Sequence, residues 1–467
     1  MKVSVQNSIV KIDRALDKEV KLVNKLLTFI GTPGFVNVGG RIKPTPAPKF
    51  RLFNINDMSF PIGMLNYVKD GFKEAEYSFI VQDGRTAPGH ITDFDLCGSG
   101  LRDYQVEAVE AVLKNPVGVI KHATGAGKSR TAISIVQKVN CRWLFLVNSS
   151  TLMHQFADSY EKLTGLQAGM LGDGVVRKRG EGSNLTVATF QTINLKIENP
   201  AMLKILEQVQ GVIVDECHGA ASETYCNILQ KCKNAYYRVG LSGTPFDRGD
   251  KAQVYILGQL GGILSEVTSV DLIKRGILAS PKIKFLKCEQ SGVVVSNWAS
   301  AKKKLIVESD KRNLLISGLV RDHVDYPCLV FCDAVAHGKS LETRFQSEGI
   351  DCKFLSGQKK TSERQKTIQD LERGELDVIV CTSIFDSGID IPSLRSIVFA
   401  GGGKSVIASI QRLGRVLRID PHTKETNAIV FDILDQGNKW LEKHAKKRMK
   451  TLRDEGHRVE VVSPKWK

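Results

Sequence analysis

The chain has 467 residues, of which 42% are hydrophobic, and a formal net charge of +16. This length excludes a single core and suits two domains of ordinary size plus a smaller one. The charge favours a polyanionic partner, because neutralised phosphates release counterions, although a solvated basic surface without a partner would carry the same charge.

Cysteine usage and hydropathy exclude further classes. The ten cysteines include no C-x₂-C pair, and Cys328, Cys332, Cys352 and Cys381 lie in predicted strands, where a free cysteine acts as a small apolar residue. Residues 1–13 lack the apolar region of a signal peptide, and no apolar run reaches membrane-spanning length. We therefore expect a cytoplasmic protein with reduced thiols, no zinc and no membrane partner.

Residues 1–95 are predicted to form a small α+β domain. Helical periodicity extends from Asp17 to Ile30. Segments rich in glycine and proline at 31–34 and 43–49 then break the pattern. The apolar face of the predicted helix carries Val20, Val23, Leu26, Leu27 and Ile30.

A strand, a glycine-rich loop and a helix are predicted between residues 116 and 138. The apolar segment 116–122 suits a buried parallel strand, and 130–138 has helical periodicity. The loop Ala-Thr-Gly-Ala-Gly-Lys-Ser at 123–129 can cradle phosphate oxygens, with Lys128 neutralising charge and Ser129 ligating Mg²⁺. His122 stands where the usual signature begins with glycine, and an ordinary glycine-rich turn is the alternative interpretation.

The segment Gly211-Val-Ile-Val-Asp-Glu216 is a second apolar strand, and it ends in two adjacent carboxylates. Because neighbouring strand residues point opposite ways, Asp215 would face a metal ion while Glu216 reaches an attacking water as general base. An acidic strand end without this chemistry is the alternative. The combination with the phosphate loop favours nucleotide hydrolysis.

Apolar strands alternate with helices through most of the chain, which predicts a parallel sheet covered on both faces in each of two domains. The first domain spans 96–279 and the second 280–435, with a hinge at Leu278-Ala-Ser-Pro281. The predicted strands lie near 117–121, 143–147, 185–189, 211–215 and 238–242, and then near 282–287, 328–332, 352–355, 377–381, 396–400 and 427–431.

The run from Gln411 to Arg418 puts Arg412, Arg415 and Arg418 on one face of a predicted helix. A solvated basic helix face is the default explanation. Gly414 inside the helix instead indicates a close approach to another group. An arginine offered from a second domain to the γ-phosphate is worth about 10³–10⁵ in rate, and it would make hydrolysis depend on domain closure.

The tail 436–467 has ten Lys or Arg residues against four acids, with Trp440 and Trp466 among them. It could grip a nucleic-acid backbone, with a tryptophan stacked on a base. The favoured interpretation is an amphipathic helix that packs Trp440 and Leu441 on the second domain and leaves its lysines in water.

Residues from about 100 to 435 resemble the superfamily 2 helicases and translocases, whose motifs occur here in the family's order. Arg102-Asp-Tyr-Gln105 resembles the adenine-reading motif, Asp-Glu-Cys-His at 215–218 the hydrolysis motif, and Ser242-Gly-Thr-Pro245 the motif that couples nucleotide state to the nucleic-acid track. The remaining motifs of the family are matched by 147–155, in which Asn148 replaces the usual proline, and by 189–192, 329–332, 354–357 and 382–390.

The resemblance, together with the residues above, assigns four groups of site residues. Catalysis would use Lys128, Asp215, Glu216, Gln411, Arg415 and Arg418. ATP would contact Arg102, Gln105, Thr124, Gly125, Ala126, Gly127, Lys128, Ser129, Gly388 and Asp390, with Mg²⁺ on Ser129 and Asp215. Coupling would involve His218, Ser242 and Thr244. DNA would contact Ser149, Gln155, Thr189, Gln191, Thr192, Ser356, Gly357 and Thr382.

Within the superfamily, the motif set is most similar to the phage branch-migration helicases of the UvsW type, with XPB-like and RecG-like DNA translocases as kin. Residues 49–65 also resemble the small N-terminal domain of those phage enzymes, in which a basic strand leads into a Phe-Pro-x-Gly helix start. The resemblance implies two tandem RecA-like parallel-sheet motor domains plus a small N-terminal domain that binds and selects DNA. A phage origin would put the protein in the host cytoplasm.

The implied function is an ATP- and Mg²⁺-dependent DNA helicase or translocase that unwinds or branch-migrates forked and junction DNA in replication, recombination or repair. A monomer is compatible with the sequence. Three rivals remain open. An RNA helicase uses the same motor, a restriction or repair subunit would normally bring a nuclease, and a catalytically silent scaffold could bind nucleic acid with the same fold.

Overall fold

In the computed structural model, the chain divides into two compact units. Unit 1 comprises Met1–Ala123 and Gly127–Val267, and unit 2 comprises Thr124–Ala126 and Thr268–Lys467. The domain limits predicted at 95, 279 and 435 stay predictions. The residues that the structure describes are 1–33, 35–38, 41–220, 223–246, 252–278, 281–290, 293–356, 361–382, 394–403, 429–454 and 456–463.

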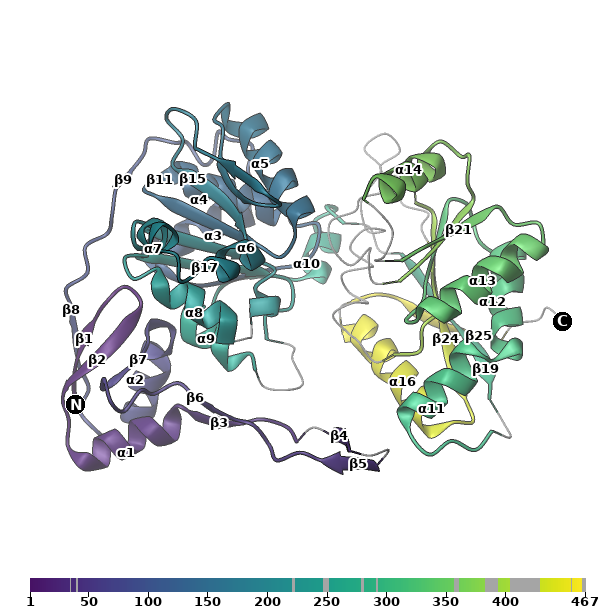
Figure 1. The fold of residues 1–467 in the computed structure, drawn as a ribbon, viewed down its shortest axis with the longest axis horizontal. Helices are drawn as coiled ribbons and strands as arrows, with labels where there is room; N and C mark the ends of the chain where they lie inside the picture. Colours follow the sequence, from purple (N-terminus) through teal and green to yellow (C-terminus); the bar gives the residue numbers. More distant parts are fainter. Residues whose placement is uncertain are drawn as a thin grey trace. The chain divides into compact units, whose positions relative to one another are not determined.

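The N-terminal part of unit 1 is a small α+β region (Figure 1). Its four-stranded sheet has the order β7-β2-β1-β8. Two helices pack against this sheet, and the helices and the sheet share one apolar core. Two short antiparallel ribbons, β3 with β6 and β4 with β5, extend away from this sheet. The elements are β1 (Lys2–Val5), β2 (Ile9–Arg14), α1 (Asp17–Leu26), β3 (Thr28–Ile30), β4 (Phe35–Val38), β5 (Arg41–Pro44), β6 (Lys49–Arg51), β7 (Ser59–Pro61), η1 (Ile62–Met64), α2 (Leu65–Glu74) and β8 (Ile80–Asp83).

The helix predicted over 17–30 is too long by four residues. The helix α1 ends at Leu26, and Thr28–Ile30 forms β3, which pairs antiparallel with β6. Val23 and Leu27 are fully buried as expected, but Ile30 is 57% exposed. Strand pairing with a distant segment therefore overrides the helical periodicity at this end.

The rest of unit 1 is an eight-stranded sheet in the order β14-β13-β15-β12-β16-β17-β10-β18. Apart from the antiparallel edge pair β13–β14, the neighbouring strands are parallel. The central strands are buried on both faces, which explains their continuous apolar sequences. The strands are β10 (Val117–His122), β12 (Trp143–Val147), β13 (Gly169–Gly172), β14 (Val175–Arg177), β15 (Leu185–Thr189), β16 (Gly211–Asp215), β17 (Tyr237–Ser242) and β18 (Ile263–Val267).

Helices cover both faces of this sheet, and each layer forms its own core (Figure 1). One face packs against α3 (Asp103–Lys114), α4 (Lys128–Lys138) and α5 (Ser150–Thr164). The other packs against α6 (Phe190–Leu195), α7 (Pro200–Glu207), α8 (Glu223–Lys231) and α9 (Val254–Leu260). The short turn η2 (Cys217–Ala220) lies between β16 and α8, and a small ribbon pairs β9 (His90–Ile91) with β11 (Val139–Asn140).

Unit 2 contains a seven-stranded parallel sheet in the order β21-β22-β20-β23-β24-β19-β25. Its elements are α10 (Ser269–Lys274), β19 (Lys282–Glu289), α11 (Trp298–Lys302), η3 (Lys303–Val307), α12 (Asp310–Asp322), β20 (Cys328–Phe331), α13 (Val335–Ser347), β21 (Cys352–Leu355), α14 (Thr361–Glu372), β22 (Val378–Cys381), β23 (Ser396–Phe399), β24 (Ile429–Gln436), α16 (Lys439–Asp454) and β25 (Val459–Val462). A strand lies at each predicted position, although β24 continues five residues beyond its predicted end at 431, whereas β13, β14, β18 and β25 were not predicted.

The basic tail is part of the second sheet domain. Helix α16 buries Leu441, Ala445, Met449 and Leu452, and its exposed side carries lysines, which confirms the amphipathic interpretation. Trp440 is half-buried, and β25 then pairs parallel with β19. Trp466 and the hinge residues Ala279 and Ser280 lie outside the described residues. Across the described part of the chain, no helix is both long and apolar enough to span a bilayer.

Candidate nucleotide site and strand-contacting edge

The loop between β10 and α4 has the backbone conformation of a phosphate cradle. Gly125 and Gly127 have φ angles of 87° and 81°, in the left-handed region that favours glycine. Gly127 is the N-cap of α4 and Lys128 its first residue, so the unpaired N–H groups of the helix start lie at the end of the loop. The strand, loop and helix predicted around 116–138 are confirmed, with Thr124 and Ala126 inside the loop.

His122 explains why the first glycine of the signature is dispensable here. It is the last residue of β10 and is fully buried. Its Nε2 lies 2.9 Å from Ser265 Oγ, and its ring packs edge-on against Tyr104 at a centroid distance of 5.5 Å. Burial, and then the charge of Lys128, lowers the pKa of His122 to about 4. The position belongs to the strand rather than to the turn, so it does not require glycine.

Gln105 connects the start of α3 to the phosphate loop. Its Oε1 accepts from the Arg102 backbone N–H at 2.9 Å, and its Nε2 donates to the Gly127 carbonyl at 3.4 Å. The side chain is only 2% exposed. Arg102 donates from Nη1 to the Tyr104 hydroxyl at 3.1 Å. Gln105 thus lies against the loop, and the contact of Arg102 and Gln105 with a base stays a prediction.

Lys128 and the two carboxylates meet at the end of β16. Lys128 Nζ donates to the His122 carbonyl at 3.4 Å and lies 3.7 Å from Glu216 Oε1. The strand ends at Asp215, and Glu216 has a φ of 45°, which is uncommon outside glycine. Its backbone N–H donates to Asp215 Oδ1 at 3.0 Å. The expectation that Asp215 and Glu216 alternate along one strand is wrong, because the strand ends at Asp215 and Glu216 has a left-handed backbone conformation.

Charge is divided unequally between the two carboxylates. Burial, together with the neighbouring charge of Glu216, raises the pKa of Asp215. Glu216 is also desolvated, but the charge of Lys128 and the contact with His218 outweigh that cost and lower its pKa. Glu216 therefore carries the negative charge, whereas Asp215 is poised to ionise when a cation arrives.

The donors around this carboxylate fit Mg²⁺. Mg²⁺ prefers oxygen ligands and is usually held by one or two protein groups plus substrate phosphates. Asp215 and the Ser129 hydroxyl are hard oxygen donors, and a cation beside Asp215 would reverse the raised pKa of that group. Within the described ranges, no three His, Cys, Asp or Glu side chains gather into a closed metal site. Two oxygen donors of this kind suit a Mg²⁺ ion that also binds nucleotide phosphates.

His218 links the hydrolysis residues to the predicted coupling motif. Its Nδ1 lies 3.2 Å from Glu216 Oε2 and 3.1 Å from Ser242 Oγ. Ser242 Oγ also accepts from the Thr244 backbone N–H at 3.1 Å, and both residues are buried. A continuous series of polar contacts therefore runs from Lys128 to Thr244.

The predicted strand contacts of unit 1 lie at the carboxyl ends of neighbouring parallel strands. Val147 at the end of β12 pairs with Thr189 at the end of β15. Ser149 caps α5 by accepting from the Leu152 backbone N–H at 3.3 Å. Thr189 is buried and donates from Oγ1 to Thr192 Oγ1 at 2.9 Å. Gln155 and Gln191 are exposed. This edge is where open parallel sheets bind ligands.

Asn148 is a functional candidate that the sequence indicated only as a departure from the family. Its Oδ1 accepts a short hydrogen bond from the Tyr225 hydroxyl on α8, and its carbonyl accepts from Gln191 Nε2 at 2.8 Å. The Tyr225 ring stacks on Phe190. Asn148 thus joins two predicted DNA-contacting segments to the helix that follows the hydrolysis motif.

In unit 2, Ser356 and Thr382 follow the neighbouring parallel strands β21 and β22. The Thr382 backbone N–H donates to the Leu355 carbonyl at 3.3 Å, and Ser356 is buried. Their contact with DNA stays a prediction. The following predicted site residues lie outside the described residues: Gly357, Gly388, Asp390, Gln411, Arg412, Arg415 and Arg418.

Comparisons with known proteins agree with this site. Residues 99–247 match the family described as type III restriction enzyme, res subunit, and residues 310–420 match the helicase conserved C-terminal domain. The chain is 27% identical over 375 residues to the DNA 3'-5' translocase XPB2 of Sulfurisphaera tokodaii, covering 72% of this chain and 82% of that protein. It is 27% identical over 359 residues to the ATP-dependent DNA helicase uvsW of Enterobacteria phage T4, covering 71% of this chain and 68% of that one.

Solved structures share the fold. The ATP-dependent type ISP restriction-modification enzyme LlaBIII bound to DNA matches 85% of this chain and 34% of its own, with a TM-score of 0.58 and 16% identity. Saccharomyces cerevisiae Dbp5 bound to RNA and ADP BeF3 matches 78% of this chain and 95% of its own, with a TM-score of 0.53 and 17% identity. One neighbour holds DNA and the other RNA, so the fold does not distinguish the two nucleic acids.

The phosphate loop, the paired carboxylates and the two parallel sheets define an ATP-dependent helicase with two RecA-like domains. The chain belongs to superfamily 2 of the helicases, and within it is similar to the UvsW and XPB proteins.

Proposed function

We propose that this helicase is a DNA translocase that hydrolyses ATP with Mg²⁺ and acts on forked, branched or partly single-stranded DNA. The observation that carries the proposal is the contact series from Lys128 through Glu216 and His218 to Ser242, because it joins the nucleotide site to the predicted coupling motif. The names of the XPB and UvsW relatives, both described as acting on DNA, support DNA over RNA.

The residues suggest a mechanism in which Lys128 changes partner when ATP binds. Lys128 Nζ lies 3.7 Å from Glu216 Oε1. A γ-phosphate in the cradle would draw the ammonium group away and leave Glu216 to accept a proton from the attacking water. Mg²⁺, held by Ser129 and Asp215, would neutralise phosphate charge. Arg415 and Arg418 would supply positive charge from the second domain, so that hydrolysis requires closure.

His218 would then couple the protonation of Glu216 to the position of the residues proposed to contact the strand. It lies within contact distance of both Glu216 and Ser242. Protonation of Glu216 weakens its attraction for His218, because the charge that holds the ring is lost. Ser242 and Thr244 would then shift relative to Thr189, Thr192 and Thr382, which are proposed to contact the track. Each hydrolysis cycle would move the strand in this way.

The decisive experiment compares ATP hydrolysis with single-stranded DNA, duplex, a four-way junction and a matching RNA at one fixed salt concentration, since affinity falls steeply with salt. We expect the fork or junction to stimulate most. Strongest stimulation by RNA would instead favour an RNA helicase, and no stimulation by any nucleic acid would favour the scaffold. Lys128→Ala should abolish hydrolysis while DNA binding persists, and turnover in that variant would refute the assigned site.

A further inference from the structure

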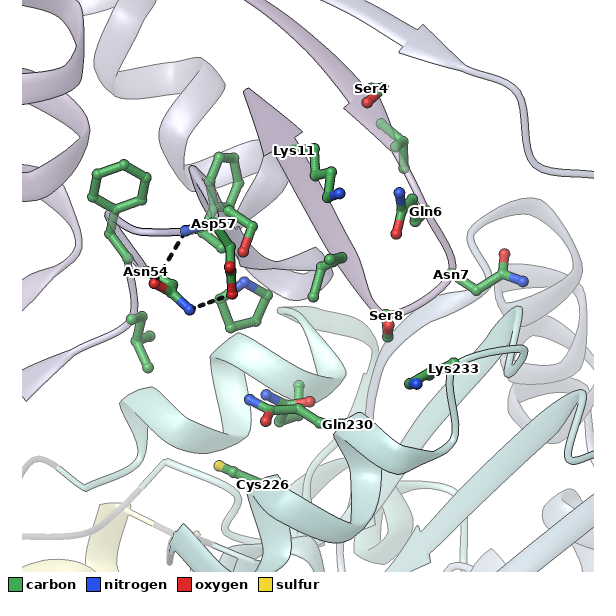
Figure 2. A pocket seen from close by; sticks show the side chains of 18 of the residues that line it. Ser4, Gln6, Asn7, Ser8, Lys11, Asn54, Asp57, Cys226, Gln230 and Lys233 are labelled. Carbon is green, nitrogen blue, oxygen red and sulfur yellow. Dashed lines mark hydrogen bonds between the residues drawn. The ribbon is translucent and has the colours of Figure 1, made fainter. Parts of the chain in front are cut away.

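A large open groove lies between the N-terminal region and the first sheet domain, on the side of α8 and α9 (Figure 2). Its volume is about 1750 Å³. The N-terminal wall includes the β1–β2 turn, where Gln6, Asn7 and Ser8 lie, and the segment after β6 that holds Asn54 and Asp57. The opposite wall carries Gln230 and Lys233. None of these residues belongs to the nucleotide site.

Many of the side chains that line the groove both donate and accept hydrogen bonds. Eight of the lining residues are amides and six are charged, and the others are apolar or small polar residues and one tyrosine. The amides are Gln6, Asn7, Asn54, Gln82, Asn227, Gln230, Asn234 and Gln259. Asparagine and glutamine present a paired donor and acceptor, the pattern that matches the hydrogen-bonding edge of a nucleobase.

The charges in the groove favour an anion. Four cations and two acids line it, a net charge of +2. Asp83 is already paired with Arg85 at 2.7 Å. Asp57 accepts from Asn54 Nδ2 at 2.7 Å. The other cations, Lys11, Arg51 and Lys233, are exposed side chains that form no ion pair within the described residues. Three such charges around an amide-rich surface suit a phosphate backbone.

Hydrogen bonds join the two walls of the groove. Asn7 Nδ2 donates to the Asn234 carbonyl at 3.2 Å, and Arg238 Nε donates to the Asn7 carbonyl at 2.9 Å. Arg238 is fully buried and also donates to the carbonyls of Leu229 and Cys232 at the end of α8. The groove is therefore a preformed feature of unit 1, which lowers the entropic cost of occupying it.

Three groove residues carry a buried polar atom that has no hydrogen-bond partner among the described residues: Asn7 Oδ1, Arg85 Nη1 and Gln259 Oε1. Gln259 lines the groove and is only 2% exposed, and its Oε1 has no hydrogen-bond partner among the described residues. An unsatisfied buried acceptor costs about 1–3 kcal/mol. An apolar side chain at this position would pack without that cost, so the amide favours a wall that receives hydrogen-bonding ligands.

We propose that this groove binds a single strand of nucleic acid, with Lys11, Arg51 and Lys233 on its phosphates and the amides on its base edges. The inference rests on the proposed function and adds a second binding surface outside the motor track. The groove exceeds the roughly 300–1,000 Å³ of small-ligand pockets, so it suits a polymer. An unpaired strand fits because its base edges are open to side chains, whereas those of a duplex are accessible only in its grooves.

The test measures binding of a fluorescein-labelled mixed-sequence 20-nucleotide single-stranded DNA by the full chain without nucleotide, between 50 and 200 mM salt. Each phosphate contact on a single strand contributes about 0.7 to the slope of log affinity against log salt. Lys11→Ala/Lys233→Ala should therefore lower that slope by about 1.4, so the loss of affinity across this salt range shrinks about sevenfold.

Lys69→Ala/Lys73→Ala is the matched control. It removes the same charge from two exposed lysines of α2 in the same N-terminal region, and neither lines the groove. We expect an unchanged slope. Asn54→Ala/Gln230→Ala should weaken binding at an unchanged slope, because amides contact bases rather than phosphates. All substituted residues are exposed, so the melting temperature should stay constant.

The outcomes separate this inference from the proposed function. Equal slopes for the two lysine variants, with DNA-stimulated hydrolysis intact, would overturn the groove alone. A slope loss confined to Lys11→Ala/Lys233→Ala would support the groove even if DNA failed to stimulate hydrolysis, which would refute only the motor function. Stronger competition by an acidic peptide than by unlabelled single-stranded DNA would assign the groove to a protein partner and would also overturn the proposal.

Discussion

A single methyl group at Gly63 tests how the N-terminal region is attached to the first sheet domain. Gly63 lies in η1, directly against the C-terminal end of α9. A Cβ there would lie 2.5 Å from the Gly261 nitrogen and 2.8 Å from the Gly258 carbonyl oxygen, and closer still to the Leu257 carbonyl oxygen. All three are backbone atoms, which cannot rotate aside as a side chain can. Gly63→Ala must therefore push η1 and α9 apart.

The magnitude follows from the cost of overpacking. An added methyl group in a well-packed interior costs about 1–3 kcal/mol. At about 1.4 kcal/mol per factor of ten, local opening of this contact should become about 5–150 times more frequent. Hydrogen exchange measured by mass spectrometry on peptides covering η1 and α9 reads that opening directly. We expect the increase to be confined to these two elements and their neighbours.

Gly258→Ala supplies a control within the same contact. Its Cβ would meet Leu52 at 3.4 Å and Pro61 at 3.6 Å, which are ordinary van der Waals distances. Gly258 also lies inside α9, where alanine is favoured over glycine by up to about 1 kcal/mol. Exchange in α9 should stay equal or slow down. If both variants speed exchange alike, or if Gly63→Ala has no effect, the close backbone approach is not what joins the two parts.

Three further changes probe other parts of the chain. Asn148→Ala removes the acceptor of a hydrogen bond worth about 1 kcal/mol, so the DNA concentration for half-maximal ATPase stimulation should rise about fivefold at constant KM for ATP; a changed KM for ATP would contradict this role. Arg448 donates two 2.8 Å bonds to buried Asp432, and Arg448→Met should destabilise unit 2 by about 3–5 kcal/mol in thermal unfolding, with Arg448→Met/Asp432→Asn partly restored. The pKa of His122 is lowered from 6.5 to about 4, so unit 1 should lose stability as pH falls through that window, where only the unfolded chain takes up the proton. His122→Phe should flatten this dependence, and an unchanged pH profile of the unfolding midpoint would refute it.

The sequence predicts a structural feature correctly where the residues that determine that feature are close together along the chain. The phosphate loop has its glycines, its lysine and its flanking elements within about 25 residues. Each parallel strand can likewise be predicted from its own apolar run, without knowledge of its neighbours. The paired carboxylates were found for the same reason. The geometry of the two carboxylates was not predicted, because Glu216 has a left-handed backbone conformation that no residue type in the run requires.

Features set by distant partners were missed. Helix α1 stops early because β3 pairs with a segment about twenty residues away. Asn148 was visible only as an unusual residue, since its partner Tyr225 is 77 positions further along. Gly63 was noted within a Phe-Pro-x-Gly pattern, yet its reason, the backbone of α9, lies almost two hundred residues away. Local sequence patterns do not predict contacts between residues so far apart along the chain.

Strand β17 relates the N-terminal groove to the nucleotide site. It begins near Arg238, which binds the Asn7 turn of the groove wall, and ends at Ser242, which contacts His218. It is hydrogen-bonded along both sides, to β10 and β16, and is fully buried. Because the strand is packed tightly on all sides, it fixes the position of the groove relative to the nucleotide site and does not change shape between them. If the groove binds DNA as proposed, groove variants should therefore change the DNA concentration that half-maximal hydrolysis requires and leave the maximal rate of hydrolysis unaltered.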